Sequence, residues 1–180
     1  MRTRKHTVRF IALGALLVVA ALVALLASRP QASVLEASSP LLGKPAPVID
    51  GSTLSGSAFD LTSYRGRWVV LSFFASWCGP CQQEQPDLVS WSYHHRGTGD
   101  PALVGVAVDD ANSQARAFMI STGATWPAVA DPNDRFAVDY GVSGPPETFF
   151  VTPAGDVAAC HLGPLTAGQL DALLGRVGAW

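Results

Sequence analysis

Two apolar runs separated by a helix-length segment constrain the fold of this chain more than any other feature. Residues 68–75 are nearly continuous in apolar and β-favouring types, and residues 102–108 repeat the pattern. Strands of this composition are covered on both faces, as in sheets flanked by helices. Between them, residues 78–96 have the length and composition of a helix, apart from Pro86. We therefore predict two parallel strands joined by a right-handed helical crossover.

Three further helices are expected after the second strand. Asn112 is a suitable N-cap for the first of them. Residues 134–140 form the second, which ends at Gly141, a residue that readily adopts a left-handed conformation. Thr166 opens the third, and Gln169 three residues later completes a capping box.

Further strands complete the expected sheet. Residues 148–151 and 157–162 flank the turn-forming sequence Pro-Ala-Gly-Asp and should pair as a hairpin. A shorter hairpin is expected around residues 51–56. Together these elements predict a single α/β domain, with a central mixed sheet of four or five strands and helices on both faces.

The N-terminal segment has a different character. Residues 10–27 contain only Phe, Ile, Ala, Leu, Gly and Val, and as a helix they would span about 27 Å, close to the thickness of a bilayer core. Four of the first nine residues are Lys or Arg and none is acidic, which keeps this end in the cytoplasm. A cleaved signal peptide is the alternative, but its apolar stretch is usually shorter and no clean cleavage site follows here.

These features divide the chain into four parts. Residues 1–9 are expected to be a cytoplasmic basic N-terminus and residues 10–28 a transmembrane signal-anchor. Residues 29–42, rich in small and polar types, are expected to be a flexible linker, and residues 43–180 the folded domain. The protein is therefore expected in the cell membrane as a single-pass protein, with its catalytic domain extracytoplasmic.

The charge of the exported part excludes one class of partner. Without the first nine residues the chain keeps eight Lys and Arg against fourteen Asp and Glu, a formal net charge of −6. An acidic surface without a basic run binds phosphate groups poorly. Nucleic acid is therefore not expected as a partner.

Cys78 and Cys81, separated by Gly79 and Pro80, carry the chemistry. Cys78 opens the predicted helix directly after the buried strand, where unpaired backbone N–H groups and the helix dipole stabilise a thiolate. A lowered thiol pKa makes Cys78 the nucleophile, and Cys81, one turn later, can resolve a mixed disulfide. Pro80 suits an early helix position, because the N–H it lacks would be unpaired there. The pattern predicts a redox-active Cys78–Cys81 disulfide without any other cofactor.

Other uses of such a pair fit the sequence less well. Structural zinc needs four ligands, and beyond Cys78 and Cys81 the candidates are Cys160 and His161, with no second cysteine pair. Haem attachment needs a His directly after the second cysteine, where this chain has Gln82. A purely structural disulfide closing so short a loop would remove little unfolded-state entropy. The zinc site stays as an alternative.

Two longer motifs resemble a known family. Residues 74–81, Phe-Ala-Ser-Trp-Cys-Gly-Pro-Cys, resemble the active-site strand and turn of thioredoxin-fold proteins, and Pro86 matches the helix-kinking proline of that fold. Residues 141–149, Gly-Val-Ser-Gly-Pro-Pro-Glu-Thr-Phe, resemble the signature of membrane-anchored TlpA/ResA/DsbE (CcmG)-type thiol–disulfide oxidoreductases, which include reductases of cytochrome c maturation. The resemblance runs from about residue 43 to the C-terminus. It implies a thioredoxin-like fold preceded by one transmembrane helix.

The resemblance also implies roles for single residues. Pro146 matches the cis-proline that faces the reactive cysteines, and Glu147 is expected beside the disulfide, where it would tune it. Glu84 matches an acid often found just after the second cysteine and is a candidate proton relay, with a solvated helix face as the alternative. Trp77 and Pro145 are expected in the surroundings of the active site.

The chain departs from the pattern at two positions. Thioredoxin has a buried Asp six residues before its first cysteine, where this chain has Ser72, so Glu147 becomes the better candidate for deprotonating Cys81. Pro145 has no N–H to donate where the fold pairs its backbone with a substrate chain. We therefore expect weaker or differently shaped substrate docking.

The leading functional hypothesis is a reductase of cysteine-containing exported proteins, such as apocytochrome c. The Gly-Pro dipeptide is that of thioredoxin, a reductant at about −270 mV. Electrons would come from a membrane thiol carrier, since a domain outside cannot use cytoplasmic thioredoxin. A disulfide-forming oxidase is the close alternative, because the potential depends on how strongly the thiolate is stabilised.

Two functions of other classes are less well supported. A peroxidase on this fold would need a Thr-containing approach to a single cysteine, which Ser76 and Trp77 do not provide. Copper delivery could use the cysteine pair and His161, because thiolates bind Cu(I) readily, although delivery proteins of this fold resemble a wider cysteine spacing. Cys160, an odd cysteine, is expected to be a buried inert thiol, with an intermolecular disulfide as the alternative.

Overall fold

The computed structural model describes residues 39–96 and 101–180. The expected cytoplasmic end and transmembrane anchor, and most of the expected linker, lie outside these residues. Within the described part, none of the helices is both long and apolar enough to span a bilayer. Ordered contacts begin slightly before the expected domain start at residue 43, because Leu41 packs against the core and Leu42 bridges to Val157.

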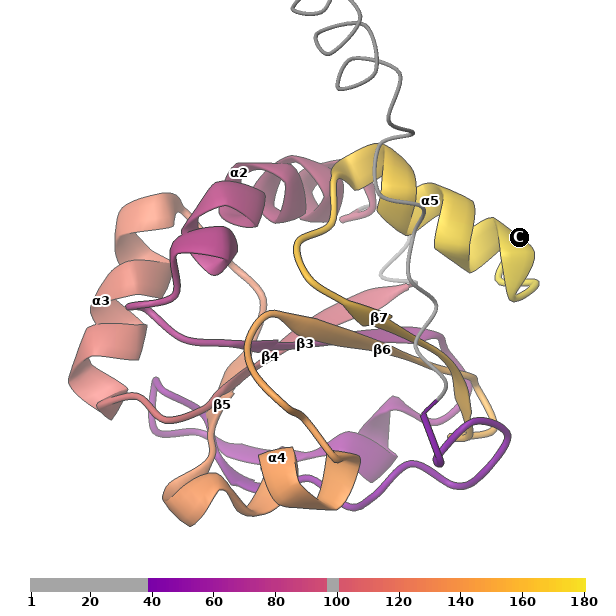
Figure 1. Ribbon diagram of the computed structural model, residues 1–180, viewed down its shortest axis with the longest axis horizontal. Helices are drawn as coiled ribbons and strands as arrows, with labels where there is room; N and C mark the ends of the chain where they lie inside the picture. Colours follow the sequence, from indigo (N-terminus) through magenta and orange to yellow (C-terminus); the bar gives the residue numbers. More distant parts are fainter. Residues whose placement is uncertain (1–38, 97–100) are drawn as a thin grey trace, which may run out of the picture. The chain divides into compact units, whose positions relative to one another are not determined.

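The centre of the fold is a five-stranded mixed sheet (Figure 1). Its strand order is β5-β4-β3-β6-β7. Strands β3, β4 and β5 are mutually parallel, while β6 runs antiparallel to both β3 and β7. The strands are Val69–Phe74 (β3), Ala102–Ala107 (β4), Ala128–Ala130 (β5), Glu147–Val151 (β6) and Val157–Leu162 (β7). The predicted parallel pair and the C-terminal hairpin are both confirmed.

Helices cover both faces of this sheet. Figure 1 shows α2 and α5 on one face and α4 on the other. Residues of α3 pack in the same apolar cluster as the cysteines at the start of α2. The helices are Gly79–His94 (α2), Asn112–Thr122 (α3), Arg135–Tyr140 (α4) and Ala167–Arg176 (α5). Strands β1 (Asp50–Ser52) and β2 (Ala58–Asp60) form the expected short antiparallel hairpin. Short 3-10 turns span Leu61–Tyr64 and Pro132–Asp134.

Local signals explain most element boundaries. The capping box of Thr166 and Gln169 opens α5, and Gly141, with φ of 70°, ends α4 as expected. The expected N-cap of α3 is wrong by one residue: Ala111 occupies that position without a side-chain hydrogen bond, and Asn112 is the first helical residue. Ala111 has an extended backbone (φ −70°, ψ 128°) and the helical conformation begins at Asn112, so the Asn112 side chain lies one position too late to act as the cap.

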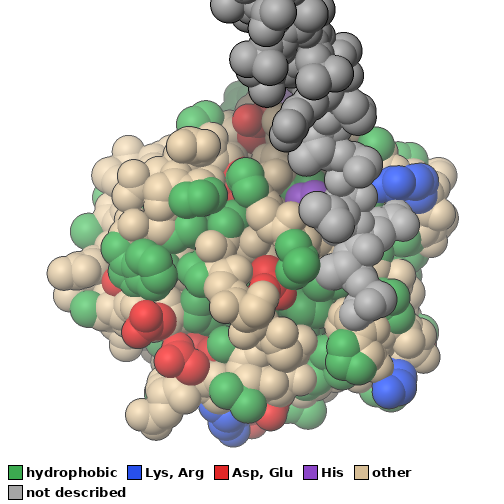
Figure 2. Space-filling view, viewed as in Figure 1, with side chains coloured by type: hydrophobic (Ala, Val, Ile, Leu, Met, Phe, Trp, Pro, Cys, Tyr) green, Lys and Arg blue, Asp and Glu red, His purple; other side chains and the backbone are tan. Residues whose placement is uncertain are grey.

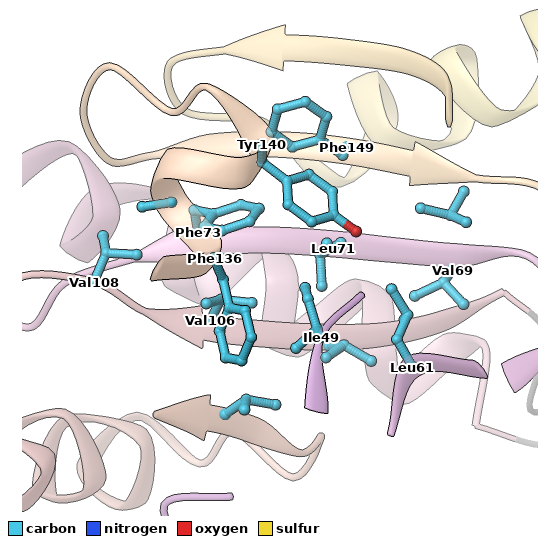
Figure 3. Packing of buried hydrophobic residues seen from close by; sticks show 14 of the residues in the cluster. Ile49, Leu61, Val69, Leu71, Phe73, Val106, Val108, Phe136, Tyr140 and Phe149 are labelled. Atoms are coloured by element: carbon cyan, nitrogen blue, oxygen red, sulfur yellow. The ribbon is translucent and has the colours of Figure 1, made fainter. Parts of the chain in front are cut away.

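Strand β3 lies in the middle of the sheet, and all six of its residues are buried. On the α4 face, the rings of Phe73, Tyr140 and Phe149 pack with centroid separations of 5.0 to 5.6 Å (Figure 3). Burial on both faces explains why the run is continuous in apolar residues rather than alternating. The chain after β3 is thereby held at one edge of the sheet, where α2 begins.

Candidate active site

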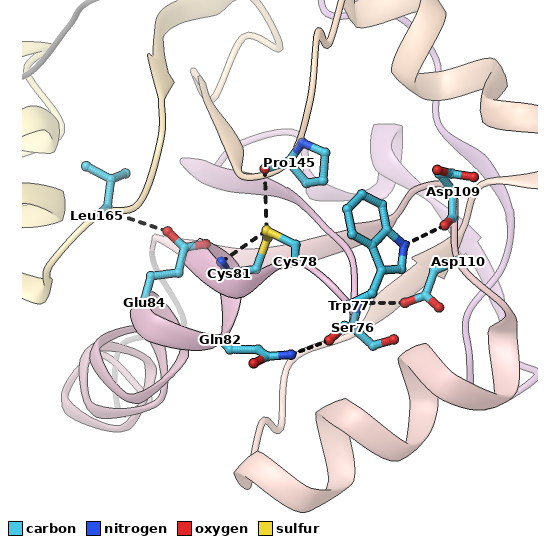
Figure 4. The surroundings of a disulfide bond; sticks show 10 residues. All are labelled: Ser76, Trp77, Cys78, Cys81, Gln82, Glu84, Asp109, Asp110, Pro145 and Leu165. Carbon is cyan, nitrogen blue, oxygen red and sulfur yellow. Dashed lines mark hydrogen bonds between the residues drawn. A yellow bond between two sulfur atoms is a disulfide. The ribbon is translucent and has the colours of Figure 1, made fainter.

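The cysteine motif lies in the turn between β3 and α2. Cys78 is the N-cap residue of α2 and is disulfide-bonded to Cys81 in its first turn (Figure 4). Both cysteines are buried, whereas Gly79 and Pro80 between them are exposed. The arrangement predicted from the spacing, a cysteine pair at a helix N-terminus, is what the structure has.

The electrostatic surroundings of Cys78 are defined by backbone groups. The Cys81 N–H donates to the Cys78 Sγ at 3.1 Å, as expected for an unpaired donor of the first helical turn. The carbonyl oxygen of Pro145 lies 3.4 Å from the same sulfur. Apolar side chains from β3, β4, β5 and α3 belong to the same buried cluster as the two cysteines. The Cys78 thiolate therefore has a helix N-terminus in its favour and a carbonyl oxygen against it.

The loop before β6 reaches the disulfide from a distant part of the chain. The Pro145–Pro146 peptide bond is cis, as the resemblance implied for Pro146. Pro146 is buried, while Pro145 is partly exposed and presents its carbonyl oxygen to Cys78. This loop therefore forms the second wall of the site.

Trp77 forms the exposed part of the site. Its side chain is 55% exposed, and its indole Nε1 donates to the Asp109 carbonyl oxygen at 2.8 Å. Figure 4 shows the ring held over the loop that follows β4. Trp77 is thus a large apolar surface of fixed orientation beside the reactive sulfur.

Glu84 is buried, which contradicts the solvated-face alternative. Its side chain lies on α2 one turn after Cys81 and is 3% exposed. Burial raises the Glu84 pKa to about 7, although a hydrogen bond from the Leu165 N–H to Oε2, 2.9 Å long, partly opposes this, and Asp87 adds to it. A carboxyl group that titrates near neutrality can exchange protons with a neighbouring thiol.

Glu147 is also buried, and its carboxylate accepts hydrogen bonds from the loop before β6 that carries Pro145 and Pro146. Its Oε1 accepts from the N–H of Ser143 at 2.7 Å, from the Ser143 hydroxyl at 2.7 Å and from the Gly144 N–H at 3.2 Å. The strand register places Glu147 opposite Phe73, on the α4 face of the sheet. These three hydrogen bonds stabilise the conformation of the loop that carries Pro145.

The remaining chemical candidates are distributed over both faces. Ser72 is buried, and its Oγ has no hydrogen-bond partner among the residues that the structure describes. Cys160 is a buried free thiol in the core cluster of the α4 face, and its pKa is raised to about 12 by burial and by Glu147. The cysteine pair belongs to the other cluster, so the structure does not bring Cys160 to Cys78 and Cys81. Among residues 39–96 and 101–180 no group of three potential metal ligands assembles.

Three polar residues that support the motif were not predicted from the sequence. The Ser76 N–H donates to Asp110 Oδ2 at 2.6 Å, and the Gln82 Nε2 donates to the Ser76 carbonyl oxygen at 2.7 Å. Asp109 adds its carbonyl oxygen as the Trp77 acceptor. The sequence contains a signal for them, because two consecutive Asp residues come after β4 and Val108, and β4 is the parallel neighbour of the strand that carries the motif.

Proteins of known family resemble this chain in sequence. The model of the AhpC/TSA family matches residues 42–160. A thiol:disulfide interchange protein of Paracoccus denitrificans, a DsbE homolog, is 35% identical over 131 residues, which cover 71% of this chain and 69% of that protein. The thiol–disulfide oxidoreductase ResA of Bacillus subtilis is 30% identical over 128 residues, covering 71% of both.

A solved structure agrees with these relatives. The chain is similar to a thiol:disulfide interchange protein of the thioredoxin family from Chlorobium tepidum, with a TM-score of 0.67 and 25% identity. The match covers 78% of this chain and 99% of that one. The expected mixed sheet with flanking helices is therefore confirmed as a thioredoxin-like fold.

Proposed function

The chain belongs to the AhpC/TSA family and is a thioredoxin-like thiol–disulfide oxidoreductase of the DsbE/ResA type, and we propose a direction and a substrate for it. We propose that it reduces the cysteine pairs of exported proteins, such as those of apocytochrome c. The proposal concerns the direction of electron flow and the substrate. Its support is the chemistry around Cys78 and the signature at residues 141–149.

The reduced site can carry out the reduction of one substrate disulfide. The Cys78 thiolate attacks one sulfur of a substrate disulfide, and the other substrate sulfur leaves as a thiolate. Cys81 then passes its proton to Glu84 and attacks the Cys78 Sγ, which releases the second substrate sulfur. The substrate gains two electrons and becomes a dithiol, while the enzyme is left with the Cys78–Cys81 disulfide seen in the structure.

The observation that carries the reducing direction is the carbonyl oxygen 3.4 Å from the Cys78 Sγ. Strong oxidants of this class owe their potential to a well-stabilised thiolate in the reduced form. Here the thiolate faces a carbonyl dipole and an apolar cluster, and the one hydrogen bond that Cys78 Sγ accepts within the described residues comes from the Cys81 N–H. Weak stabilisation of the thiolate favours the disulfide, and hence a low reduction potential.

The equilibrium reduction potential tests this direction. We expect a value of about −250 mV or lower in a dithiothreitol redox buffer, near that of thioredoxin. A value of about −120 to −150 mV would identify a disulfide-forming oxidase and remove the cytochrome proposal.

We further propose that residues 10–28 anchor the protein in the cell membrane with the catalytic domain outside. The uncharged apolar run and the basic residues before it support this topology. A membrane thiol carrier would then supply the electrons. Labelling of intact cells, after reduction, with a membrane-impermeant maleimide tests the topology, because an outward domain is modified at Cys78 and a cytoplasmic one is not.

A further inference from the structure

A pocket lies at the edge of the sheet opposite the cysteine motif. The motif follows the carboxyl end of β3, whereas this pocket is formed where the parallel strands β3, β4 and β5 begin and where α2 ends. Its volume is about 200 Å³, and it is open to solvent on one side. A cavity of about 150 Å³ is enough to hold one benzene molecule. The pocket therefore has room for a small organic molecule at a place that the redox chemistry does not use.

Two arginines line this pocket, and neither forms a salt bridge with a residue that the structure describes. The Arg67 guanidinium carbon lies 4.7 Å from the centre of the Tyr64 ring, and the Arg67 Nε is buried without a hydrogen-bond partner in the described part of the chain. Arg96 donates from Nη2 to the Thr125 hydroxyl at 3.2 Å. A guanidinium carries five N–H donors. The two side chains therefore bring positive charge and unused donors to the pocket.

The remaining wall of the pocket is largely aromatic. Trp91 is buried, its Nε1 donates to Asp171 Oδ1 at 2.7 Å, and the His95 ring stacks on it with a centroid separation of 4.3 Å. Because its N–H is already bonded, Trp91 offers the pocket only apolar surface. Within the described residues, no Asp or Glu lines the pocket. The aromatic side chains that line it are those of Tyr64, Trp91, His95 and Trp126.

Guanidinium groups beside an aromatic wall define the chemistry of a ligand. The planar fork of an Arg side chain matches a carboxylate, and an aromatic ring packs favourably on aromatic side chains. The end of α2 acts against an anion, because the last carbonyls of a helix carry about half a negative charge. One of them, the Trp91 carbonyl, already accepts from the His95 N–H at 3.2 Å. The two positive charges of Arg67 and Arg96 outweigh this helix end.

We propose that the pocket binds a small aromatic carboxylate, whose carboxylate group accepts from Arg67, with Arg96 as a second positive charge, and whose ring packs on Trp91. Inorganic phosphate would match the guanidinium but not the aromatic wall, and a neutral ring would match the wall but not the guanidinium. Binding here involves neither cysteine. The inference therefore goes beyond thiol–disulfide exchange and does not depend on the direction of that reaction.

Benzoate, its uncharged isostere benzamide and inorganic phosphate are the probes that test the ligand chemistry. In ¹H–¹⁵N NMR titrations of the full-length chain, benzoate should shift the Arg67 Nε–H and Trp91 indole signals together, with one dissociation constant. Benzamide and phosphate should each bind at least about tenfold more weakly, because each lacks one of the two contacts. Equal affinity for benzoate and benzamide would overturn the selection of an anion. Equal affinity for benzoate and phosphate would overturn the role of the aromatic wall.

Charge-removing variants locate the binding. Arg67→Gln should weaken benzoate binding about tenfold, and Arg96→Gln about threefold. Arg116→Gln removes the same charge from an exposed position of α3 and should change the dissociation constant less than about twofold. Thermal unfolding checks that each variant is folded. If Arg67→Gln is not, Arg67→Lys keeps the charge without the planar fork and should weaken binding about fivefold. Equal effects of Arg67→Gln and Arg116→Gln, or no shift with benzoate, would overturn the proposal.

Discussion

At the scale of single residues, the site consists of groups whose properties are set by their neighbours rather than by their type. Glu84 shows this most directly, because the same side chain on an exposed helix face would titrate near its ordinary value of 4.5. Burial under the Leu165 segment moves its pKa to about 7. A carboxyl group with this pKa is suited to the proton transfer from Cys81 that we propose.

Replacing Glu84 by Gln should slow the resolving step on the order of 100-fold at pH 7, because a general base is lost. The exchange rate should also lose its inflection near pH 7. Stopped-flow measurement of the release of a mixed disulfide checks both. Gln83→Glu, at an exposed position of the same helix, adds a charge without entering the site and should leave the profile unchanged.

The same group makes a stability prediction. The folded-state pKa of Glu84 exceeds the unfolded one, so the native protein holds more protons and its stability falls as pH rises from about 4.5 to 7. The loss amounts to roughly 3 kcal/mol. Urea unfolding of oxidised Glu84→Gln should show a decline smaller by about this amount over that range. An equal decline in both proteins would show that Glu84 is not the group responsible.

Pro145 leads to a prediction about substrate docking. It lies at the reactive sulfur without an N–H to offer a substrate chain. Pro145→Ala should restore one backbone donor and lower the KM for a disulfide peptide about fivefold, as one net hydrogen bond would. The kcat should change less than the KM, and a KM that does not fall would contradict the expected docking.

At the scale of elements, the short helix α4 is held in place by a side chain from the segment before it. Asp131, in the turn before α4, accepts from the Phe136 N–H at 2.9 Å and the Ala137 N–H at 2.8 Å. These are donors of the first turn of α4 that would otherwise be unpaired and buried. The helix is only six residues long, so its position depends on this contact and on the packing of Tyr140.

Asp131→Ala should therefore destabilise the protein by about 1 to 2 kcal/mol. Asp139→Ala removes the same charge from an exposed position of α4 and should cost less than about 0.5 kcal/mol. Chemical denaturation of both variants measures the difference. Equal losses would mean that the charge, rather than the two hydrogen bonds, is what matters.

At the scale of the whole molecule, the site is assembled where several strands meet one edge of the sheet. The carboxyl ends of β3 and β4 and the start of the antiparallel β6 lie together there, as the strand register requires. The face of the molecule seen in Figure 2 is a mixture of apolar, polar and acidic side chains, with Lys and Arg at separate places near its edge.

The proposed reducing direction has a consequence for the stability of the whole fold. If the disulfide is the favoured form, linkage requires the oxidised protein to be more stable than the reduced one. We expect dithiothreitol to lower the Tm by a few degrees. A rise in Tm on reduction would instead indicate an oxidant, in agreement with a high potential.

The features that depend on neighbours along the chain could be predicted without the structure. The buried strands, the capping box at Thr166, the stop at Gly141 and the cysteine pair at a helix start all follow from composition and spacing within a few residues. Such signals act through local backbone geometry, and for this reason they can be recognised in the sequence without the tertiary structure.

The contacts between groups far apart in the chain could not be predicted in this way and are seen only in the folded protein. Glu84 finds its donor at Leu165, 81 residues away, and Cys78 meets the Pro145 carbonyl 67 residues away. Burial and hydrogen-bond partners set the charge of a carboxyl group, and both arise only when distant segments pack together.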